Sequence, residues 1–424
     1  MGRGAALAAL PPHPDRDPLN VAGAPPPAPD AEPPPLPEPL GAGVYVHVPF
    51  CRVHCPYCDF AVRPHRAAEE PRLVAGVLAE LERRAPSREG LADDGRPWGS
   101  LYFGGGTPSR LAPESFGALT AGLDARLRFA PGHERSLEAN PEDVDDARVA
   151  AWRTAGVTRV SLGAQSFHDD ELRRLGRTHG SAGIEDAATR LAAHGLDDWS
   201  LDLMYAYPLH TLERFAASLA RAIALGPPHV SAYAYTPEPG TPLGDAVRAG
   251  RKAKPEGDDE AAYFELAHDT LEAAGYRHYE VSNFARPGFA TRHHLRYWRR
   301  GSYLGLGPSA VSFLGGRRVT APRDLLAWER ALPDAPAAWE VDDSDAHAAF
   351  ETAFLGLRLD GGMRLADWPA RVTPGERAAW IRAGDELVRR GALVRTAAGF
   401  RLPRAARALA DEAVALWRDL AESR

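Results

Sequence analysis

The sequence contains few residues of several types, and each shortage excludes some classes of protein. The 424-residue chain holds three cysteines and three methionines, and its only lysines are Lys252 and Lys254. No run of about 18 apolar residues is present, so no membrane-spanning helix is predicted. The cysteines are odd in number and clustered, which excludes a secreted disulfide framework. A reducing compartment follows, and we expect a cytoplasmic protein.

The charge balance is mildly acidic. The formal net charge is −7 and the isoelectric point is about 6.1, which argues against a nucleic-acid partner held by bulk charge. We attribute the excess of arginine over lysine to codon usage in a GC-rich genome. No basic amphipathic helix that would bind a membrane is evident, which leaves peripheral contact through a partner open.

The first 40 residues differ in composition from the rest. They hold 13 of the 38 prolines, and a segment this rich in proline forms neither a helix nor a strand ladder. We therefore predict a disordered tail over 1–40.

From residue 41 onward, short β-rich runs alternate with helix-like stretches. The predicted strands are 44–48, 101–103, 136–139, 159–163, 199–205 and 229–235. The predicted helices are 69–85, 112–127, 145–155, 169–174, 183–194 and 212–224. This alternation is typical of parallel βα units. We predict an α/β fold, a partial (βα)6 barrel over 41–245, with a doubly wound open sheet as the structural alternative.

Two further regions follow the barrel. Residues 246–338 are predicted to form an α+β extension, with a helix near 258–274, a strand at 279–283 and a glycine-rich segment at 301–307. Residues 339–424 combine helical stretches with a hairpin-like run at 392–401 and resemble a small winged-helix domain. The acidic balance favours a packing or partner role for this domain rather than DNA binding.

The main chemical feature is the spacing of Cys51, Cys55 and Cys58, C-x3-C-x2-C, on the loop after the first strand. Three thiolates on one short loop can ligate three irons of a cubane cluster and leave the fourth iron open. A structural zinc site is the alternative, but it needs a fourth ligand, for which His54 or His47 would have to serve. An inert group of cysteines is the remaining alternative.

Polar and small residues follow the other predicted strands. Gly104–Gly106 and Thr107 come after the second strand, and glycines allow close backbone approach to a ligand. Glu138 ends the third strand and could accept hydrogen bonds from ribose hydroxyls. Gln165 ends the fourth strand, and Arg177 beyond it could pair with a carboxylate. Asp202 lies inside an apolar strand, where a buried carboxylate requires a partner.

Together these motifs resemble the radical S-adenosylmethionine superfamily. The segment Tyr45 to Cys58 reads YVHVPFCRVHCPYC, and the following GGGTP at 104–108 matches the same family. The resemblance covers roughly residues 43–360 and implies a 4Fe–4S cluster on Cys51, Cys55 and Cys58. It further implies that S-adenosylmethionine is bound by Tyr45, Gly105, Gly106, Thr107, Glu138, Gln165, Arg177, Asp202 and Ala234.

The closest resemblance is to the branch that holds oxygen-independent coproporphyrinogen III oxidases and heme chaperones. The oxidases carry a fourth cysteine two residues after the third, and here that position is Phe60. Oxidases also have a folded N-terminal extension, which a proline-rich tail does not supply. Both features favour a heme chaperone, with heme and a heme-accepting protein as partners, and the oxidase as the alternative.

A second motif supports the chaperone interpretation. Residues 292–298 read RHHLRYW, which resembles the H-N-x-x-Y-W motif of the chaperones except that His294 stands in place of asparagine. Histidine is a common heme ligand and aromatic rings pack on porphyrins. The resemblance therefore implies heme contacts by His293, His294, Tyr297 and Trp298, and leaves open which histidine would ligate the iron.

Overall fold

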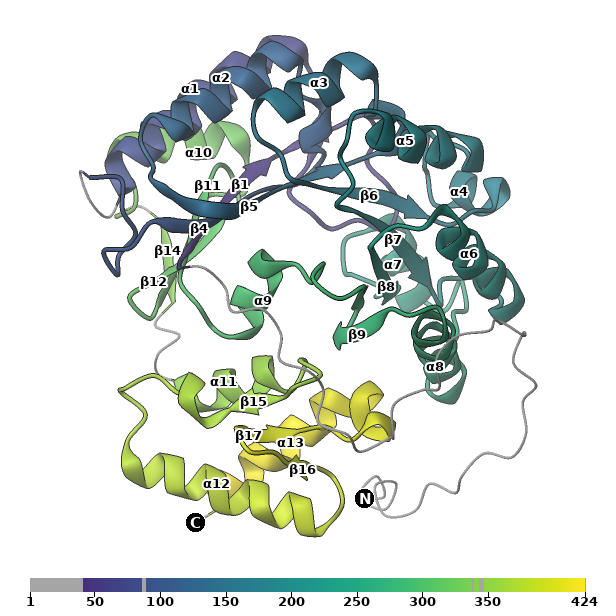
Figure 1. Cartoon of the computed structure of the whole chain (residues 1–424), viewed down its shortest axis with the longest axis vertical. Helices are drawn as coiled ribbons and strands as arrows, with labels where there is room; N and C mark the ends of the chain where they lie inside the picture. The colour runs from purple at the N-terminus through teal and green to yellow at the C-terminus, as the bar shows by residue number, and fades with distance from the viewer. Residues whose placement is uncertain (1–40, 86–88, 338, 343–346, 424) are drawn as a thin grey trace.

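The computed structural model describes residues 41–85, 89–337, 339–342 and 347–423. The predicted tail over 1–40 lies outside the described residues. The chain folds as an α/β protein around one large sheet, followed by a smaller helical unit with its own core (Figure 1).

The large sheet has 12 strands among the described residues, in the order β14-β13-β12-β11-β1-β4-β5-β6-β7-β8-β10-β9. All six predicted parallel strands are present. They are β1 (Gly43–Val48), β4 (Trp98–Gly105), β5 (Phe129–Ala139), β6 (Arg159–Gln165), β7 (Trp199–Tyr205) and β8 (His229–Ala234). A short parallel pair, β2 (Phe50–Cys51) and β3 (Arg63–Pro64), stands apart and holds the base of the cysteine loop.

The predicted barrel helices are also present. They are α1 (Glu70–Arg84), α2 (Pro113–Asp124), α3 (Asp146–Thr154), α4 (Asp169–Arg174), α5 (Ser181–Ala193) and α6 (Leu212–Leu225). The six strands follow one another in chain order across the sheet, and the helices line its outer side (Figure 1). A doubly wound sheet reverses its strand order at a switch point, so the partial barrel is confirmed over that alternative.

Local sequence explains several of these elements. Parallel strands covered on both faces are apolar throughout, and β1 and β7 are buried along most of their length. Helix α6 begins after Thr211, whose side chain accepts a hydrogen bond from the backbone N–H of Arg214. It ends at Gly226, whose φ of 72° is readily adopted only by glycine.

The region after β8 departs from prediction in two places. The single strand predicted at 279–283 is wrong, because β9 (Arg277–Glu280) ends there and β10 (Asn283–Ala285) returns antiparallel to it. The glycine-rich segment at 301–307 contains β11 (Tyr303–Leu306), a seventh parallel strand that pairs with β1. Gly305 is required in it, since a Cβ there would lie 2.1 Å from the carbonyl oxygen of Val311.

The remaining described elements of this region are four helices, and three strands that extend the β11 edge of the sheet. They are α7 (Pro242–Arg248), α8 (Asp258–Ala273), α9 (Arg292–Trp298), β12 (Val311–Leu314), β13 (Arg317–Thr320), α10 (Leu325–Ala331) and β14 (Glu340–Asp342). Short 3₁₀ helices occur at Ala67–Glu69, Pro108–Arg110, Pro141–Asp143, Leu332–Asp334, Leu365–Asp367 and Arg404–Leu409.

The C-terminal unit has a separate apolar core. Its elements are α11 (Ala348–Gly356), β15 (Met363–Arg364), α12 (Pro374–Arg389), β16 (Val394–Arg395), β17 (Gly399–Arg401) and α13 (Ala410–Glu422). The predicted hairpin is confirmed as β16 and β17, with β15 pairing on the other side of β17. The unit lies beside α9 and β9 (Figure 1). The domain boundaries given above stay predictions.

Candidate functional site

A cavity of about 420 Å³ opens at the carboxyl ends of the parallel strands. This is the end at which parallel βα barrels carry their chemistry. Most of the residues predicted to bind a cofactor line it: Cys51, Cys55, Cys58, Gly105, Gly106, Thr107, Glu138, Gln165, Arg177, Asp202 and Ala234. The fold therefore brings together residues that are up to 183 positions apart in the chain.

The cysteine loop forms one wall of this cavity. All three thiols are free and half-buried, and a turn closes with a hydrogen bond of 3.1 Å from the N–H of Cys58 to the carbonyl of Cys55. Burial raises the pKa of Cys51 to about 11 and also raises that of Cys58. Among the described residues, no three His, Cys, Asp or Glu side chains stand in metal-binding geometry. Metal binding here would have to displace protons from the thiols and draw the sulfurs together.

A chain of polar contacts links two of the cysteines across the cavity. Thr107 Oγ1 lies 3.3 Å from Cys51 Sγ and accepts a hydrogen bond from Asn140 Nδ2 at 3.3 Å. The Asn140 Oδ1 accepts a bond from Arg177 Nη2, which also donates to the carbonyl of Gly163 at 2.8 Å. Arg177 Nη1 lies 3.9 Å from Cys55 Sγ. The loop sulfurs are thus tied to the ends of three different strands.

The histidines required by the zinc alternative are occupied elsewhere. His54 Nε2 shares a hydrogen bond of 2.9 Å with the carbonyl of Cys58. The two ring nitrogens of His47 contact the Tyr45 hydroxyl at 3.1 Å and the Ala61 carbonyl at 3.0 Å. Ligation of a metal by His54 Nε2 or by either ring nitrogen of His47 would therefore cost one of these contacts.

The glycines of GGGTP are required by the protein's own packing. Gly105 has a φ of 108°, and a Cβ there would lie 2.5 Å from the His47 ring. A Cβ on Gly106 would lie 2.9 Å from the carbonyl oxygens of Val48 and Phe50. The sequence predicted close approach to a ligand, and the structure adds that these residues allow the cysteine loop to lie directly over the end of β4.

Two carboxylates that line the cavity, Glu138 and Asp202, accept hydrogen bonds from neutral groups. Glu138 accepts hydrogen bonds from the Tyr102 hydroxyl at 2.8 Å and the Gly105 N–H at 3.1 Å, and burial raises its pKa to about 7. Asp202 accepts bonds from Ser161 Oγ at 3.0 and 3.1 Å, and burial raises its pKa to about 6. The partner predicted for Asp202 is therefore a hydroxyl. Within the described part of the chain neither residue forms an ion pair, so both would favour a cation in the cavity.

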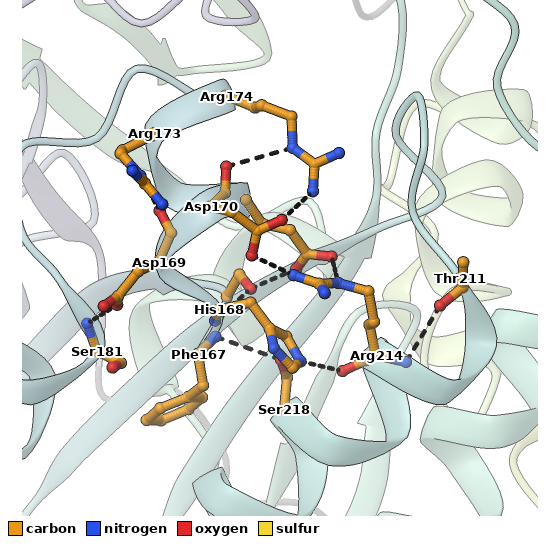
Figure 2. A network of polar contacts seen from close by, with 12 residues as sticks. Phe167, His168, Asp169, Asp170, Arg173, Arg174, Ser181, Thr211, Arg214 and Ser218 are labelled. Atoms are coloured by element: carbon orange, nitrogen blue, oxygen red, sulfur yellow. Dashed lines mark hydrogen bonds and ion pairs between the residues drawn. The ribbon is translucent and has the colours of Figure 1, made fainter.

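A polar network fixes the segment that carries Gln165 and Arg177. Figure 2 shows Arg214 of α6 bonded to Asp170 of α4, while the amide N–H of Ser181 at the start of α5 donates to Asp169 at 2.8 Å. Gln165 immediately precedes this network and has a φ of 69°. Because a non-glycine residue at such a φ carries strain, its backbone must be held by its surroundings.

The two residues that follow Arg177 are held by the carboxylate of Glu142. The Glu142 carboxylate contacts His179 Nδ1 at 3.1 Å and accepts a bond from the Thr178 hydroxyl. Burial alone would raise the pKa of Glu142, but these hydrogen bonds lower it to about 2. Arg177 itself forms no ion pair among the described residues, which leaves a half-buried guanidinium facing the cavity beside the thiols.

A second cavity of about 500 Å³ adjoins the first and shares Asp59, Phe60, Gly105 and Glu138 with it. Tyr45, predicted to contact the cofactor, lines this second cavity and not the first. The other lining residues are His47, Ala61, Tyr297, Arg300, Gly301, Tyr303, Ser309, Val311, Phe313, Arg318, Arg323 and Leu355. Aromatic rings and guanidinium groups dominate its walls.

The four residues of the predicted heme motif separate in the structure. Only Tyr297 reaches the second cavity. His293 is fully buried, and its ring nitrogens contact Ser100 Oγ and the Tyr297 hydroxyl, both at 2.6 Å. His294 lies beside the ring of Tyr102, and Trp298 packs against Tyr279 and its apolar neighbours. Ligation of a metal by His293 would require it to give up one of these contacts.

Sequence reasoning missed several residues that line the first cavity. Asn140 follows Glu138 by two positions, and its place at a strand end was the available signal. Ser161 supports Asp202, and the Tyr233 hydroxyl donates to Gln165. Their contacts depend on strand register, since Ser161 and Asp202 come from neighbouring strands.

Comparison with known proteins places this geometry in a family. Residues 45–222 match the model of the radical SAM superfamily. The chain is 34% identical over 336 residues to the heme chaperone HemW of Synechocystis, covering 78% of this chain and 81% of that protein. It is 37% identical over 377 residues to HemW of Mycobacterium tuberculosis H37Rv, covering 84% and 95%.

A solved structure supports the fold independently. Coproporphyrinogen III oxidase (HemN) from Escherichia coli superposes with a TM-score of 0.74 at 21% identity, over 89% of this chain and 90% of that one. At this identity the likeness concerns the fold alone. From the cysteine-lined cavity, the superfamily match and the extent of identity to HemW proteins, we conclude that the chain belongs to the HemW family of the radical SAM superfamily.

Proposed function

We propose that the protein is a heme chaperone that carries a 4Fe–4S cluster, binds S-adenosylmethionine and passes heme to an acceptor protein. The observation that carries the proposal is the meeting of three thiols, a half-buried guanidinium and two carboxylates that form no ion pair in the portion of the chain that the structure describes, all in one cavity. We include a cytoplasmic location in the proposal. No helix in the described ranges combines the length and the apolar character needed to cross a bilayer.

The donor set fits a cluster with three protein ligands. Cys51, Cys55 and Cys58 would hold it through their thiolates, and once bound it would supply an open iron position and one electron. Arg177 lies close to Cys55 and lowers the cost of negative charge on the sulfurs. Thr107 contacts Cys51 and would orient that thiolate.

The remaining groups fit S-adenosylmethionine, which carries a sulfonium, an ammonium, a carboxylate and two ribose hydroxyls. Glu138 and Asp202 would supply negative charge and accept hydrogen bonds at the floor of the cavity. Arg177 is the guanidinium placed to pair with a carboxylate. When a cationic ligand binds, it lowers the pKa of both Glu138 and Asp202, since a nearby positive charge favours the ionised form.

We propose the second cavity as the site that would bind heme. Its volume falls within the range of about 300–1,000 Å³ that small-molecule sites occupy. Tyr45, Tyr297, Tyr303 and Phe313 supply aromatic walls for a flat ring. Arginines supply positive charge for propionates. The shared wall at Glu138 would put heme next to S-adenosylmethionine.

The test is a transfer experiment with the cluster-loaded full chain. Hemin is titrated under anaerobic conditions, and an apo-acceptor such as apomyoglobin is then added while the absorbance of the acceptor's heme is followed. We expect one heme per chain and transfer faster than from free hemin at the same concentration. Absence of heme binding would refute the proposal.

The oxidase alternative is tested in the same preparation. Coproporphyrinogen III, S-adenosylmethionine and a reductant are supplied, and porphyrin products are separated after oxidation. Because Phe60 replaces the additional cysteine of the oxidases, we expect no conversion of the propionates to vinyl groups. Robust turnover would favour the oxidase over the chaperone.

A further inference from the structure

One wall of the second cavity is built from two arginines on a single aromatic ring. The guanidinium carbon of Arg300 lies 4.7 Å from the centre of the Phe313 ring, and that of Arg318 lies 5.2 Å from it. All three residues line the cavity. Stacking on an aromatic ring fixes the plane of a guanidinium and leaves its N–H groups directed sideways.

Both arginines are held by one carboxylate from the C-terminal unit. Glu351 on α11 accepts from Arg300 through one carboxylate oxygen and from Arg318 through the other. The Glu351 side chain is 15% exposed and does not line the cavity, whereas Leu355, one turn further along α11, does. The C-terminal unit thus closes this wall and supplies one carboxylate that pairs with both arginines.

The backbone at Arg300 is strained. Its φ is 53°, and Gly301 follows it with no room for a Cβ, which would lie 2.7 Å from Arg296. A non-glycine residue is seldom kept at such a φ unless its position matters. The contacts with Phe313 and Glu351 hold Arg300 in this conformation at the end of α9.

We propose that Arg318, supported by Arg300, receives a carboxylate of a flat anionic ligand in the second cavity, and that Glu351 is the internal carboxylate which this ligand displaces. The inference rests on the proposed function, in which the ligand is heme and the carboxylate is a propionate. Arg–carboxylate pairs share one geometry, so a propionate and Glu351 compete for the same N–H groups. Loading of the cavity then releases α11, the helix that ties the C-terminal unit to the wall.

The test compares hemin with hemin dimethyl ester, in which both propionates are capped. Each is titrated into the cluster-loaded full chain of the wild type and of the Glu351→Gln, Arg318→Gln and Arg318→Lys variants. Glu329→Gln is the matched control, since Glu329 pairs with Arg72 and neither residue lines this cavity.

We expect Glu351→Gln to tighten hemin binding and Arg318→Gln to weaken it, each by about tenfold, the effect of one charge-assisted hydrogen bond. Arg318→Lys should fall between, because it keeps the charge and loses the planar geometry. The ester should bind all variants equally. If Arg318→Gln fails to fold, the Glu351→Gln result decides alone.

Hydrogen exchange supplies the second measurement. Amide exchange over 348–356 should increase when hemin binds the wild type and should already be raised in Glu351→Gln. Hemin binding that is unchanged by Glu351→Gln and Arg318→Gln would overturn the displacement while leaving the chaperone function intact. Failure of the wild type to bind hemin at all would overturn both.

Discussion

Replacement of Asp202 by asparagine should stabilise the empty protein and weaken its binding of S-adenosylmethionine. Asp202 lies in the apolar strand β7, and its bonds to Ser161 hold an amide as well as a carboxylate because the hydroxyl can rotate. Burial raises its pKa from the ordinary 3.8 to about 6. At about 1.4 kcal/mol per pKa unit, the charged form costs about 3 kcal/mol. Water in the cavity reduces this to about 1–2 kcal/mol.

The sign of the pH dependence follows from the raised pKa. Below about pH 4 the side chain is neutral in both the folded and unfolded states, so the substitution changes little. Between about pH 4 and 6 the unfolded chain ionises first, and the wild type loses stability relative to Asp202→Asn. Above pH 6 the difference is constant. Urea unfolding of the cluster-free protein at pH 4, 5 and 8 measures this difference in the free energy of unfolding between the wild type and Asp202→Asn.

Glu142→Gln serves as the control with opposite sign. Its pKa is lowered to about 2 by hydrogen bonds from His179 and Thr178, although burial opposes them. The ionised form is therefore favoured in the folded protein, and Glu142→Gln should be destabilising above about pH 4, with the difference disappearing as the pH falls toward 2. The electrostatic reasoning is refuted if Asp202→Asn lowers the free energy of unfolding at pH 8. It is also refuted if Asp202→Asn and Glu142→Gln change that free energy with the same sign.

Three further predictions concern the same cavity. Cys55→Ser should not assemble a cluster, so the absorption near ~400 nm should be missing after anaerobic reconstitution; an intact band would refute the ligand assignment. Gly106→Ala should lower the free energy of unfolding by about 1–3 kcal/mol, because its Cβ would lie 2.9 Å from backbone atoms; Gly117→Ala on α2, where a Cβ meets nothing within 4 Å, should be neutral or stabilising. Arg177→Lys should weaken S-adenosylmethionine binding about tenfold in calorimetry, since a single Nζ cannot replace both Nη2, which donates to Asn140 and Gly163, and Nη1, which lies beside Cys55; unchanged affinity would remove Arg177 from the carboxylate site.

The barrel was predictable from the sequence because its signals are local. Strands such as β1 and β7 are largely apolar, and a helix follows each of the six strands along the chain. Residues at strand ends are brought together by that topology, which is why Glu138, Gln165 and Asp202 could be placed in one site. The same reasoning overlooked Asn140, whose role is defined by a contact with Arg177 37 residues away.

The features that sequence reasoning missed depend on distant pairing. β11 pairs with β1 across about 260 residues, and its glycines resemble a loop until the crowding by Val311 is known. The strand expected at 279–283 contains a turn, because the chain folds back to pair β10 with both β8 and β9. The heme contacts of the motif at 292–298 stay a prediction, and of its four residues only Tyr297 lines the second cavity.

Iron and sulfide analysis of anaerobically reconstituted protein, together with its absorption spectrum, tests the central claim most directly. We predict about four irons and four sulfides per chain, with a broad band near ~400 nm that changes when S-adenosylmethionine is added. A single zinc per chain with no sulfide, or no iron–sulfur absorption at all, would contradict the account.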